Sequence, residues 1–244
     1  MLSYLNTVKE IQDSQTSMAI IPIGSIEQHG SHLPVGTDYL IVSELSKRVA
    51  ERIDAYLLPP LPISTCYEHK GTKGTTWMKP DTFYKMLQDI VLSLKNQGFD
   101  KIVVLLGHGG IYIAGPAIRE LNAMYADLQV IKIEGINNEK IKAVLDGDNG
   151  IHAGEKETSC ILYLHEELVK KELMKQNDFV PDYPRDFLNY APLSELSKTG
   201  VWGKPSLASG EKGEKLFEVM EESCVEYIER AFRYTKREAW KEEK

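Results

Sequence analysis

The chain carries the sequence MAIIPIGSIEQHGSHLPVGTD over residues 18–38. Its apolar start, which ends in Pro and Gly, predicts a short buried strand over 18–23. The rest of the stretch, 24–38, is rich in Gly, His and acidic residues. Because ligand sites of open α/β sheets lie beyond the carboxyl ends of strands, we expect this polar segment to belong to a site.

Strands and helices alternate along the rest of the chain. Apolar runs predict further strands over 56–61, 101–106 and 128–133. Helical spacing of apolar residues predicts helices over 39–53, 81–96, 111–126, 155–168 and 211–233. This order predicts an α/β fold with a mainly parallel sheet that helices cover on both faces. Two segments, 62–80 and 176–210, show no regular pattern, and long irregular segments of this kind are often lids or interface loops.

Composition excludes several classes of protein. The 244 residues include 36 acidic and 29 basic ones, for a net charge of −7, so nothing indicates a nucleic-acid-binding surface. No apolar run approaches the ~20 residues that cross a bilayer, and the N-terminus lacks the features of a signal peptide. The three cysteines, Cys66, Cys160 and Cys224, are odd in number and widely spaced, which argues against a disulfide framework. We therefore expect a soluble cytoplasmic protein that binds neither nucleic acid nor membranes.

The 24–38 segment offers three metal-ligating side chains. Glu27 and His29 are two residues apart, so an extended segment directs both the same way. Asp38 follows a turn that contains Gly and Pro and can fold back toward them. Glu, His and Asp are the ligands expected for Zn, Mn or Fe at a hydrolytic site. Taken alone, the same residues are equally well explained as the solvated end of a strand.

Two further motifs strengthen the metal interpretation. GHGG, residues 107–110, directly follows the apolar strand KIVVLL and places His108 at a strand's carboxyl end. GIHAGEKETS, residues 150–159, carries His152, Glu155 and Glu157 around a helix start, where the glutamates also suit the helix dipole. Histidines of an ordinary core have no reason to gather in Gly-flanked loops. The three motifs together therefore predict a metal site.

These residues also resemble a known family. PIGSIEQHGSHLPVGTD, GHGG and HAGEKETS, with the weaker string EHKGTKGTTWMKPDTF, are similar to the motifs of the creatininase (creatinine amidohydrolase) family over about residues 18–165. The resemblance implies one three-layer α/β/α domain over 1–244 and a site for two divalent ions per chain, Zn in first place and Mn or Fe as alternatives. It implies the metal ligands Glu27, His29, Asp38, His108 and Glu157, with Asp38 bridging.

The resemblance also implies a reaction. Family members hydrolyse C–N bonds of cyclic or formylated amides, so we expect a small-molecule substrate attacked by a metal-bridged hydroxide. His152 matches the family's catalytic histidine and is expected to protonate the leaving nitrogen, with Glu155 as an alternative proton carrier. Family enzymes are often hexamers, which implies a homo-oligomer.

Several residues depart from the family pattern. Creatininase carries an acidic ligand two residues after the GH histidine, where this chain has Gly110, and Glu157 is the natural replacement. Ile111 replaces a usual Asn, and GTKGTTW adds Lys73 and Trp77 where an FPGT-type string is common. These changes argue against creatinine itself as the substrate.

Other polar and aromatic residues have two interpretations. His32, Glu68 and His69 are candidates for pocket or ligand-supporting roles, although a structural or solvated role is simpler. Trp77 and Trp202 are candidates for the walls of a ring-shaped pocket, although aromatic side chains more often fill a core.

Three alternative functions stay open. Ser25 or Ser159 could act as a nucleophile without metal, but neither lies in a G-x-S-x-G elbow. The chain could also be a non-catalytic metal-binding or structural homologue of the fold. A third alternative is a hydrolase that acts on a ring substrate without nitrogen.

Overall fold

Five parallel strands form one sheet in the order β1-β3-β2-β4-β5. The computed structural model describes residues 1–134, 139–147 and 150–234; the other positions of the domain expected over 1–244 lie outside the described residues. The strands are β1 (Leu2–Ser3), β2 (Met18–Ile23), β3 (Tyr56–Leu57), β4 (Lys101–Leu106) and β5 (Gln129–Glu134). The predicted α/β fold with a parallel sheet is confirmed.

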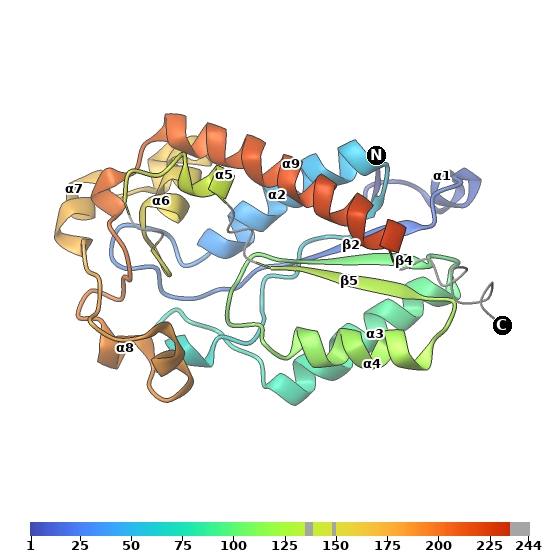
Figure 1. The fold of residues 1–244 in the computed structure, drawn as a ribbon, viewed down its shortest axis with the longest axis horizontal. Helices are drawn as coiled ribbons and strands as arrows, with labels where there is room; N and C mark the ends of the chain where they lie inside the picture. Colours follow the sequence, from blue (N-terminus) through green and yellow to red (C-terminus); the bar gives the residue numbers. More distant parts are fainter. Residues whose placement is uncertain (135–138, 148–149, 235–244) are drawn as a thin grey trace.

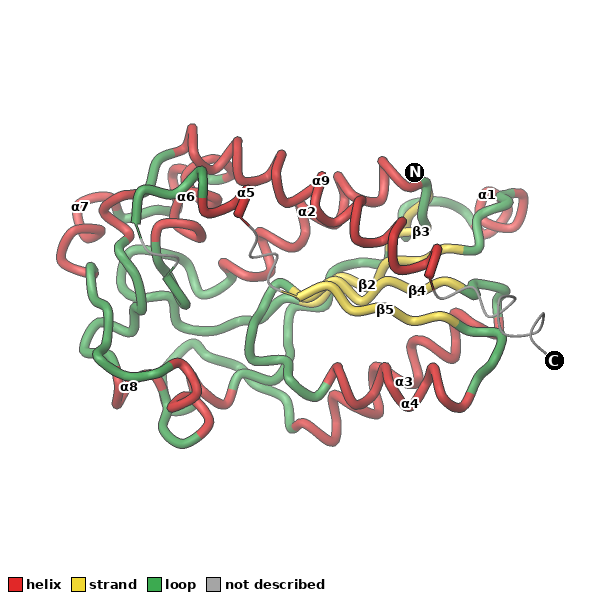
Figure 2. Tube along the Cα trace, viewed as in Figure 1, coloured by secondary structure: helices red, strands yellow, loops and turns green. Residues whose placement is uncertain are grey.

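Helices cover both faces of this sheet, which gives the three layers expected from the family resemblance (Figure 1). One layer contains α2 (Thr37–Ile53), α5 (Glu139–Lys142), α6 (Glu155–Leu164) and α9 (Gly210–Tyr234). The opposite layer contains α3 (Pro80–Asn96) and α4 (Ala114–Met124). The short helices are α1 (Val8–Asp13), α7 (Lys171–Met174) and α8 (Leu193–Leu196). Figure 2 shows that α6, α7 and α8 lie at the end of the molecule toward which the strands run, with a long connection from α7 to α8.

The central strands are apolar on both faces because each face packs against helices. Ile20 and Val103 belong to the core between the sheet and α2 with α9, whereas Ile21 and Val104 belong to the core between the sheet and α3 with α4. Successive strand residues point to opposite faces, so a strand covered on both sides reads as an unbroken apolar run. This is why the sequence patterns of β2 and β4 were recognisable.

Some element boundaries differ from the predictions. The strand predicted over 56–61 ends at Leu57, since Pro59, Pro60 and Pro62 remove backbone donors from the following residues. The helix predicted over 111–126 begins only at Ala114, because the residues before it complete the turn after β4. The helix predicted over 155–168 ends at Leu164, and a separate 3-10 turn follows. The short elements β1, α1 and α5 were not predicted.

The start of α2 sits directly on the carboxyl ends of β2 and β4. The two ends are level, since Gly107 N donates to Ile23 O at 2.8 Å. A Cβ on Gly24 would lie 2.6 Å from Tyr39 Cα, and one on Gly107 would lie 2.7 Å from Val42 Cβ. Glycine at both strand ends therefore allows the close approach of α2, which brings its first turn to the sheet edge.

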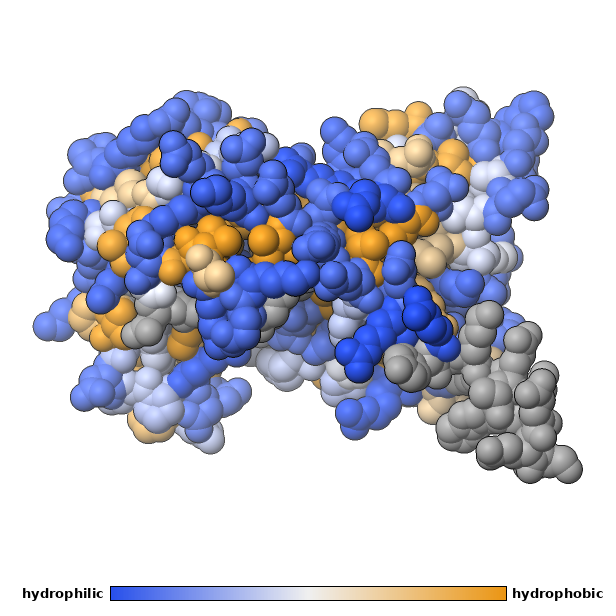
Figure 3. Space-filling view, turned by 45° about the horizontal axis from the view of Figure 1, so that its top comes forward, coloured by the Kyte–Doolittle hydropathy of each residue, from blue (hydrophilic) through white to orange (hydrophobic). Residues whose placement is uncertain are grey.

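The face formed by α2 and α9 is mainly hydrophilic at its surface, with hydrophobic residues visible between the helices (Figure 3). No helix among the described residues is long and apolar enough to cross a membrane.

Candidate metal centre

Asp38 is the centre of a buried polar cluster at the sheet edge. It lies in the first turn of α2 and is 2% exposed. Its Oδ1 is 3.3 Å from His29 Nε2, and its Oδ2 is 3.2 Å from His108 Nδ1. The carboxylate of Asp38 thus stands between two histidines that follow different strands.

The five residues expected as metal ligands form two groups that share Asp38. Glu27, Asp38 and His108 make one group, and His29, Asp38 and Glu157 make the other. Within each group the donor atoms lie within 4.8 Å of one another. In the first group, Glu27 Oε2 is 3.1 Å from His108 Nδ1. The structure therefore brings all five residues together, with Asp38 between the pair Glu27 and His108 and the pair His29 and Glu157.

Glu157 reaches the cluster from the start of α6. Its Oε2 is 3.9 Å from His29 Nε2 and accepts a hydrogen bond from Ala153 N at 2.5 Å. Ala153 has φ = +51°, in the left-handed region that residues other than glycine rarely adopt. The backbone of Ala153 in the turn before α6 thus adopts an unfavourable conformation, and in this conformation its N–H holds the Glu157 carboxylate in place.

Several donor atoms of the cluster are buried without an aligned hydrogen bond. Among the described residues these include both carboxylate oxygens of Glu27, Asp38 Oδ2, and Nε2 of His29 and of His108. Buried polar atoms in this state are costly unless a partner satisfies them. A divalent cation is such a partner, and mixed His and carboxylate donors suit Zn, Mn and Fe. The residues present therefore fit two divalent ions.

The carboxylates of the cluster raise the pKa of two of its histidines. Burial opposes protonation of His29, but Asp38, with Glu157 and Glu27, raises its pKa to about 9. Burial likewise opposes protonation of His108, but Glu27 and Asp38 raise its pKa well above the ordinary value. The excess negative charge of the cluster thus stabilises positive charge on its histidines, as it would stabilise bound cations.

His152 is arranged as a proton acceptor. Its Nε2 is 2.7 Å from the backbone oxygen of Gln28, which can only accept, so we assign the ring hydrogen to Nε2. Nδ1 then keeps its lone pair and lies 3.6 Å from Glu27 Oε1. Burial, with the charges of His29 and His69, holds the pKa of His152 well below its ordinary value. In this tautomer the neutral ring presents an unprotonated Nδ1 to the cluster.

His69 and Glu68 also contact the cluster, although the sequence favoured a structural role for both. His69 is 4% exposed, and its Nε2 is 3.1 Å from Glu27 Oε1. Glu68 Oε1 is 2.9 Å from His108 Nε2. The Gln28 side chain lies 3.0 Å from His69 Nδ1 and so connects this turn to the first motif. The EH pair inside the weaker family string was the one signal in the sequence for these residues.

Comparison with known proteins identifies the family. The family model for creatininase, described as creatinine amidohydrolase, matches residues 5–228. The chain belongs to the creatininase family. The resemblance drawn from the sequence motifs is therefore confirmed.

Three relatives of this creatininase-family chain are hydrolases by name. It is 30% identical over 233 residues to the creatinine amidohydrolase of Pseudomonas putida, covering 88% of each chain. It is 28% identical over 225 residues to the mycofactocin precursor peptide peptidase of Mycolicibacterium smegmatis, covering 89% of this chain and 86% of the other. It is 28% identical over 255 residues to the 3-dehydro-scyllo-inosose hydrolase of Thermotoga maritima, covering 93% and 81%. The chain is thus a creatininase-family, amidohydrolase-type hydrolase.

Solved structures of the family have the same fold. The crystal structure of creatinine amidohydrolase matches with a TM-score of 0.81 at 26% identity, covering 94% of this chain and 97% of that one. A Zn–Zn form of a creatininase variant and a Mn form of creatininase match with TM-scores of 0.79 and 0.81.

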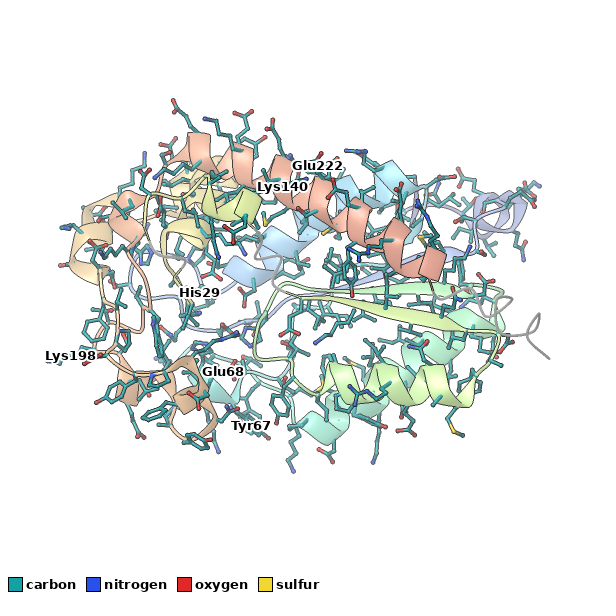
Figure 4. The ribbon with its side chains drawn as sticks, in the orientation of Figure 1. His29, Tyr67, Glu68, Lys140, Lys198 and Glu222 are labelled. Carbon is teal, nitrogen blue, oxygen red and sulfur yellow. The ribbon has the colours of Figure 1, made fainter. Side chains whose placement is uncertain are left out.

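A cavity of about 710 Å³ lies over the cluster. Asp38, His108 and His152 line it, and its walls are formed by the 3-10 turn Tyr67–His69 and the segment 185–193, which contains the 3-10 helix Arg185–Asn189. Figure 4 shows His29, Glu68 and Tyr67 following one another outward through this region. The two segments that lacked a sequence pattern, 62–80 and 176–210, therefore contribute the surfaces that a substrate would contact.

The residues that depart from the family pattern and the two tryptophans considered as pocket walls lie in different places. Ile111 is fully buried in the core against α3 and α4, not in the cavity wall. Trp202, 5% exposed, lines the cavity. Trp77 packs against the edge of Tyr67, with ring centroids 4.9 Å apart, and so supports a wall residue from behind. Lys73 is exposed. The change at Ile111 therefore alters core packing, not substrate contacts.

Two candidate residues contact other parts of the molecule. Glu155 is 2% exposed, and its carboxylate accepts from the backbone of Asp146 and Gly147 and from Lys212 Nζ at 2.5 Å. It is in neither donor group. His32 Nε2 is 3.0 Å from Thr158 Oγ1, and burial lowers the pKa of His32 to about 4.

The two serines considered as nucleophiles have no histidine partner among the described residues. Ser25 Oγ is buried without a hydrogen bond, and Ser159 Oγ accepts from Ser209 N at 3.2 Å. A serine nucleophile needs an adjacent base, so the metal interpretation is favoured.

The protonated His29 gives a prediction for the metal-free protein. Its folded pKa of about 9 lies above the unfolded value of 6.5, so its contribution to stability is complete below pH 6.5 and lost as pH rises through 9. At about 1.4 kcal/mol per pKa unit, we expect the free energy of unfolding to fall by about 3 kcal/mol over this range. Urea unfolding at pH 6.5 and 9 measures the change.

The control for this prediction is His165→Gln, which removes a histidine whose side chain is 42% exposed and should keep the full pH dependence. Saturating Zn should reduce the dependence, since the cation replaces the proton. Equal stability of the metal-free protein at both pH values would contradict the assignment.

Proposed function

We propose that this chain is a metal-dependent amidohydrolase that cleaves a C–N bond of a cyclic amide or formamide-type small molecule. The observation that carries the proposal is the pair of buried donor groups that share Asp38 beneath a cavity of about 710 Å³. Two relatives, an amidohydrolase and a peptidase by name, belong to classes that cleave C–N bonds, which supports this reaction type.

We infer that the site takes two divalent ions, Zn in first place, with Mn or Fe as alternatives. Glu27 and His108 would hold one ion, His29 and Glu157 the other, and Asp38 both. Ions held there would lower the pKa of a bound water toward about 7, which would supply a hydroxide, and would polarise a substrate carbonyl. Zn and Mn forms among the matching creatininase structures support the choice of metals.

The proton transfers are assigned to His152. Its Nδ1 lone pair faces the donor groups and would take the proton released by the attacking water. The same nitrogen would then give that proton to the leaving nitrogen of the substrate. Glu155, the alternative carrier, is already engaged by Lys212 and by two backbone N–H groups, which favours His152 for this role.

A second candidate is hydrolysis of a ring substrate without nitrogen. It is favoured by the 28% identity with the 3-dehydro-scyllo-inosose hydrolase of Thermotoga maritima, which extends over 93% of this chain. The same water activation serves both reactions, so the two candidates differ in the leaving group. A panel of lactams, cyclic ureides, formamides and carbocyclic ketones separates them.

Metal removal tests the shared part of both candidates. Dialysis against a strong chelator is expected to abolish turnover, and about two equivalents of Zn or Mn per chain should restore it. Elemental analysis of the purified protein and titration of the metal-free protein measure the stoichiometry.

Two other outcomes would oppose the proposal. Turnover that survives complete metal removal would favour a serine nucleophile. Two bound ions with no hydrolysis across the panel would favour a non-catalytic homologue.

We further propose that the protein works as a cytoplasmic homo-oligomer on a small-molecule substrate. Light scattering of the protein as it elutes from a sizing column measures the oligomeric state.

A further inference from the structure

The 3-10 turn Tyr67–His69 places an acid beside the far side of the His108 ring. Glu68 Oε1 is 2.9 Å from His108 Nε2, and the side chain of Glu68 is 13% exposed. The other ring nitrogen, Nδ1, faces Glu27 at 3.1 Å and Asp38 at 3.2 Å. The His108 ring therefore stands between the proposed ligands of one ion and the Glu68 carboxylate.

Gly110 provides the space that this carboxylate occupies. A Cβ on Gly110 would lie 1.7 Å from Glu68 Oε1 and 2.3 Å from His108 Nε2, so no side chain fits there while Glu68 holds its place. The two loops are also tied together, since Thr65 Oγ1 donates to Gly110 O at 3.0 Å. Glycine at position 110 thus leaves the space in which an acid from another loop reaches the His108 ring.

We propose that Glu68 is a positioning residue that orients His108 for binding one metal ion with Glu27 and Asp38. The proposal rests on the proposed metal-dependent function. A histidine that binds a metal through one ring nitrogen commonly donates its other N–H to a carboxylate, which fixes the ring and makes it a better ligand.

The contact between Glu68 Oε1 and His108 Nε2 is close but lacks the alignment of a hydrogen bond. His108 Nε2 has no aligned hydrogen bond to any part of the chain that the structure describes, although Glu68 Oε1 is its near neighbour. Glu68 is thus the acid beside Nε2, the ring nitrogen that faces away from Glu27 and Asp38.

The role of Glu68 predicts a selective loss of metal affinity. Glu68→Gln keeps the shape of the side chain and removes its charge. Loss of such a supporting carboxylate typically weakens metal binding by about 10- to 100-fold. The loss should fall on the ion held with His108, while the ion held by His29 and Glu157 should change by less than about threefold.

Competition between the metal-free protein and a chromophoric chelator for Zn measures both affinities. We expect two equivalents at saturation for the wild type and for Glu68→Gln, with one affinity lowered in the variant. Asp186→Asn is the matched control, because Asp186 also lines the cavity, whereas the acids that lie beside His108 among the described residues are Glu27, Asp38 and Glu68. It should leave both affinities within about twofold of the wild type.

Two further measurements make the result decisive. The absorption spectrum of the Co-loaded Glu68→Gln protein should keep the wild-type coordination number, whereas loss of a direct ligand would change it and reduce the stoichiometry. Urea unfolding of both metal-free proteins shows whether the variant folds normally.

Unchanged affinities in a folded Glu68→Gln protein, or a stoichiometry of one, would overturn the positioning role and leave the proposed function intact. A wild-type protein that binds no metal would instead overturn the proposed function itself.

Discussion

Asp38→Ala is expected to remove both metal ions and all measurable turnover. Asp38 contacts His29 and His108 and belongs to both donor groups, so its loss leaves each group with two residues. Metal ions stabilise the transition state of such hydrolyses by several kcal/mol, so we expect a decrease in kcat/KM of at least about 10³-fold. Elemental analysis and turnover of the purified variant measure both losses.

The matched control for Asp38→Ala is Asp81→Ala. Asp81 is also an acid in the first turn of a helix, but it is exposed and lies outside the cluster. Replacing either acid removes a favourable charge from a helix N-terminus, a loss of about 0.3–1 kcal/mol. Only Asp38→Ala should lose metal. A purified Asp38→Ala protein with the metal content of the wild type would disprove the shared-ligand assignment.

The second large effect is expected for His152→Ala, which should keep both metal ions and lose about 10²- to 10⁴-fold in kcat. His152 faces the cluster through Nδ1 and is held by the backbone of Gln28 through Nε2. Removing it takes away the proton carrier and leaves the two groups around Asp38 complete. Steady-state kinetics beside metal analysis separate these two consequences.

His152 also belongs to a third cluster, with Glu27 and His29, whose donor atoms lie within 4.8 Å of one another. Loss of one metal equivalent in His152→Ala would make His152 a ligand, and an unchanged rate would remove it from the reaction. His165→Ala, at an exposed position, is the matched control and should behave as the wild type.

The parts of this structure that could be predicted from sequence are those with strong local patterns. β2 and β4 are buried on both faces and read as apolar runs. Since parallel strands end at one sheet edge, the polar residues that follow them could be expected to meet, and Glu27, His29 and His108 do so. The strand predicted over 56–61 was too long. The segment is apolar, but Pro59 and Pro60 have no backbone N–H to donate to a neighbouring strand, and the strand ends at Leu57.

Other parts depend on contacts between distant loops. Glu68 reaches His108 only because Gly110 has no side chain, and no spacing rule connects two positions that are forty residues apart along the chain. Glu155 resembles Glu157 in sequence, yet the helix directs the two to different partners, Lys212 and the cluster. Short-range patterns do not contain this information.

The donor residues and the walls of the cavity come from different parts of the chain. Strand ends and helix starts hold the donors, while the Tyr67–His69 turn and the segment 185–193 form the walls. Such a division lets a lineage exchange the surfaces that select a substrate without disturbing the residues that do the chemistry. It gives a physical reason why proteins with names as different as a creatinine amidohydrolase, a precursor-peptide peptidase and a 3-dehydro-scyllo-inosose hydrolase all match this one chain along most of its length.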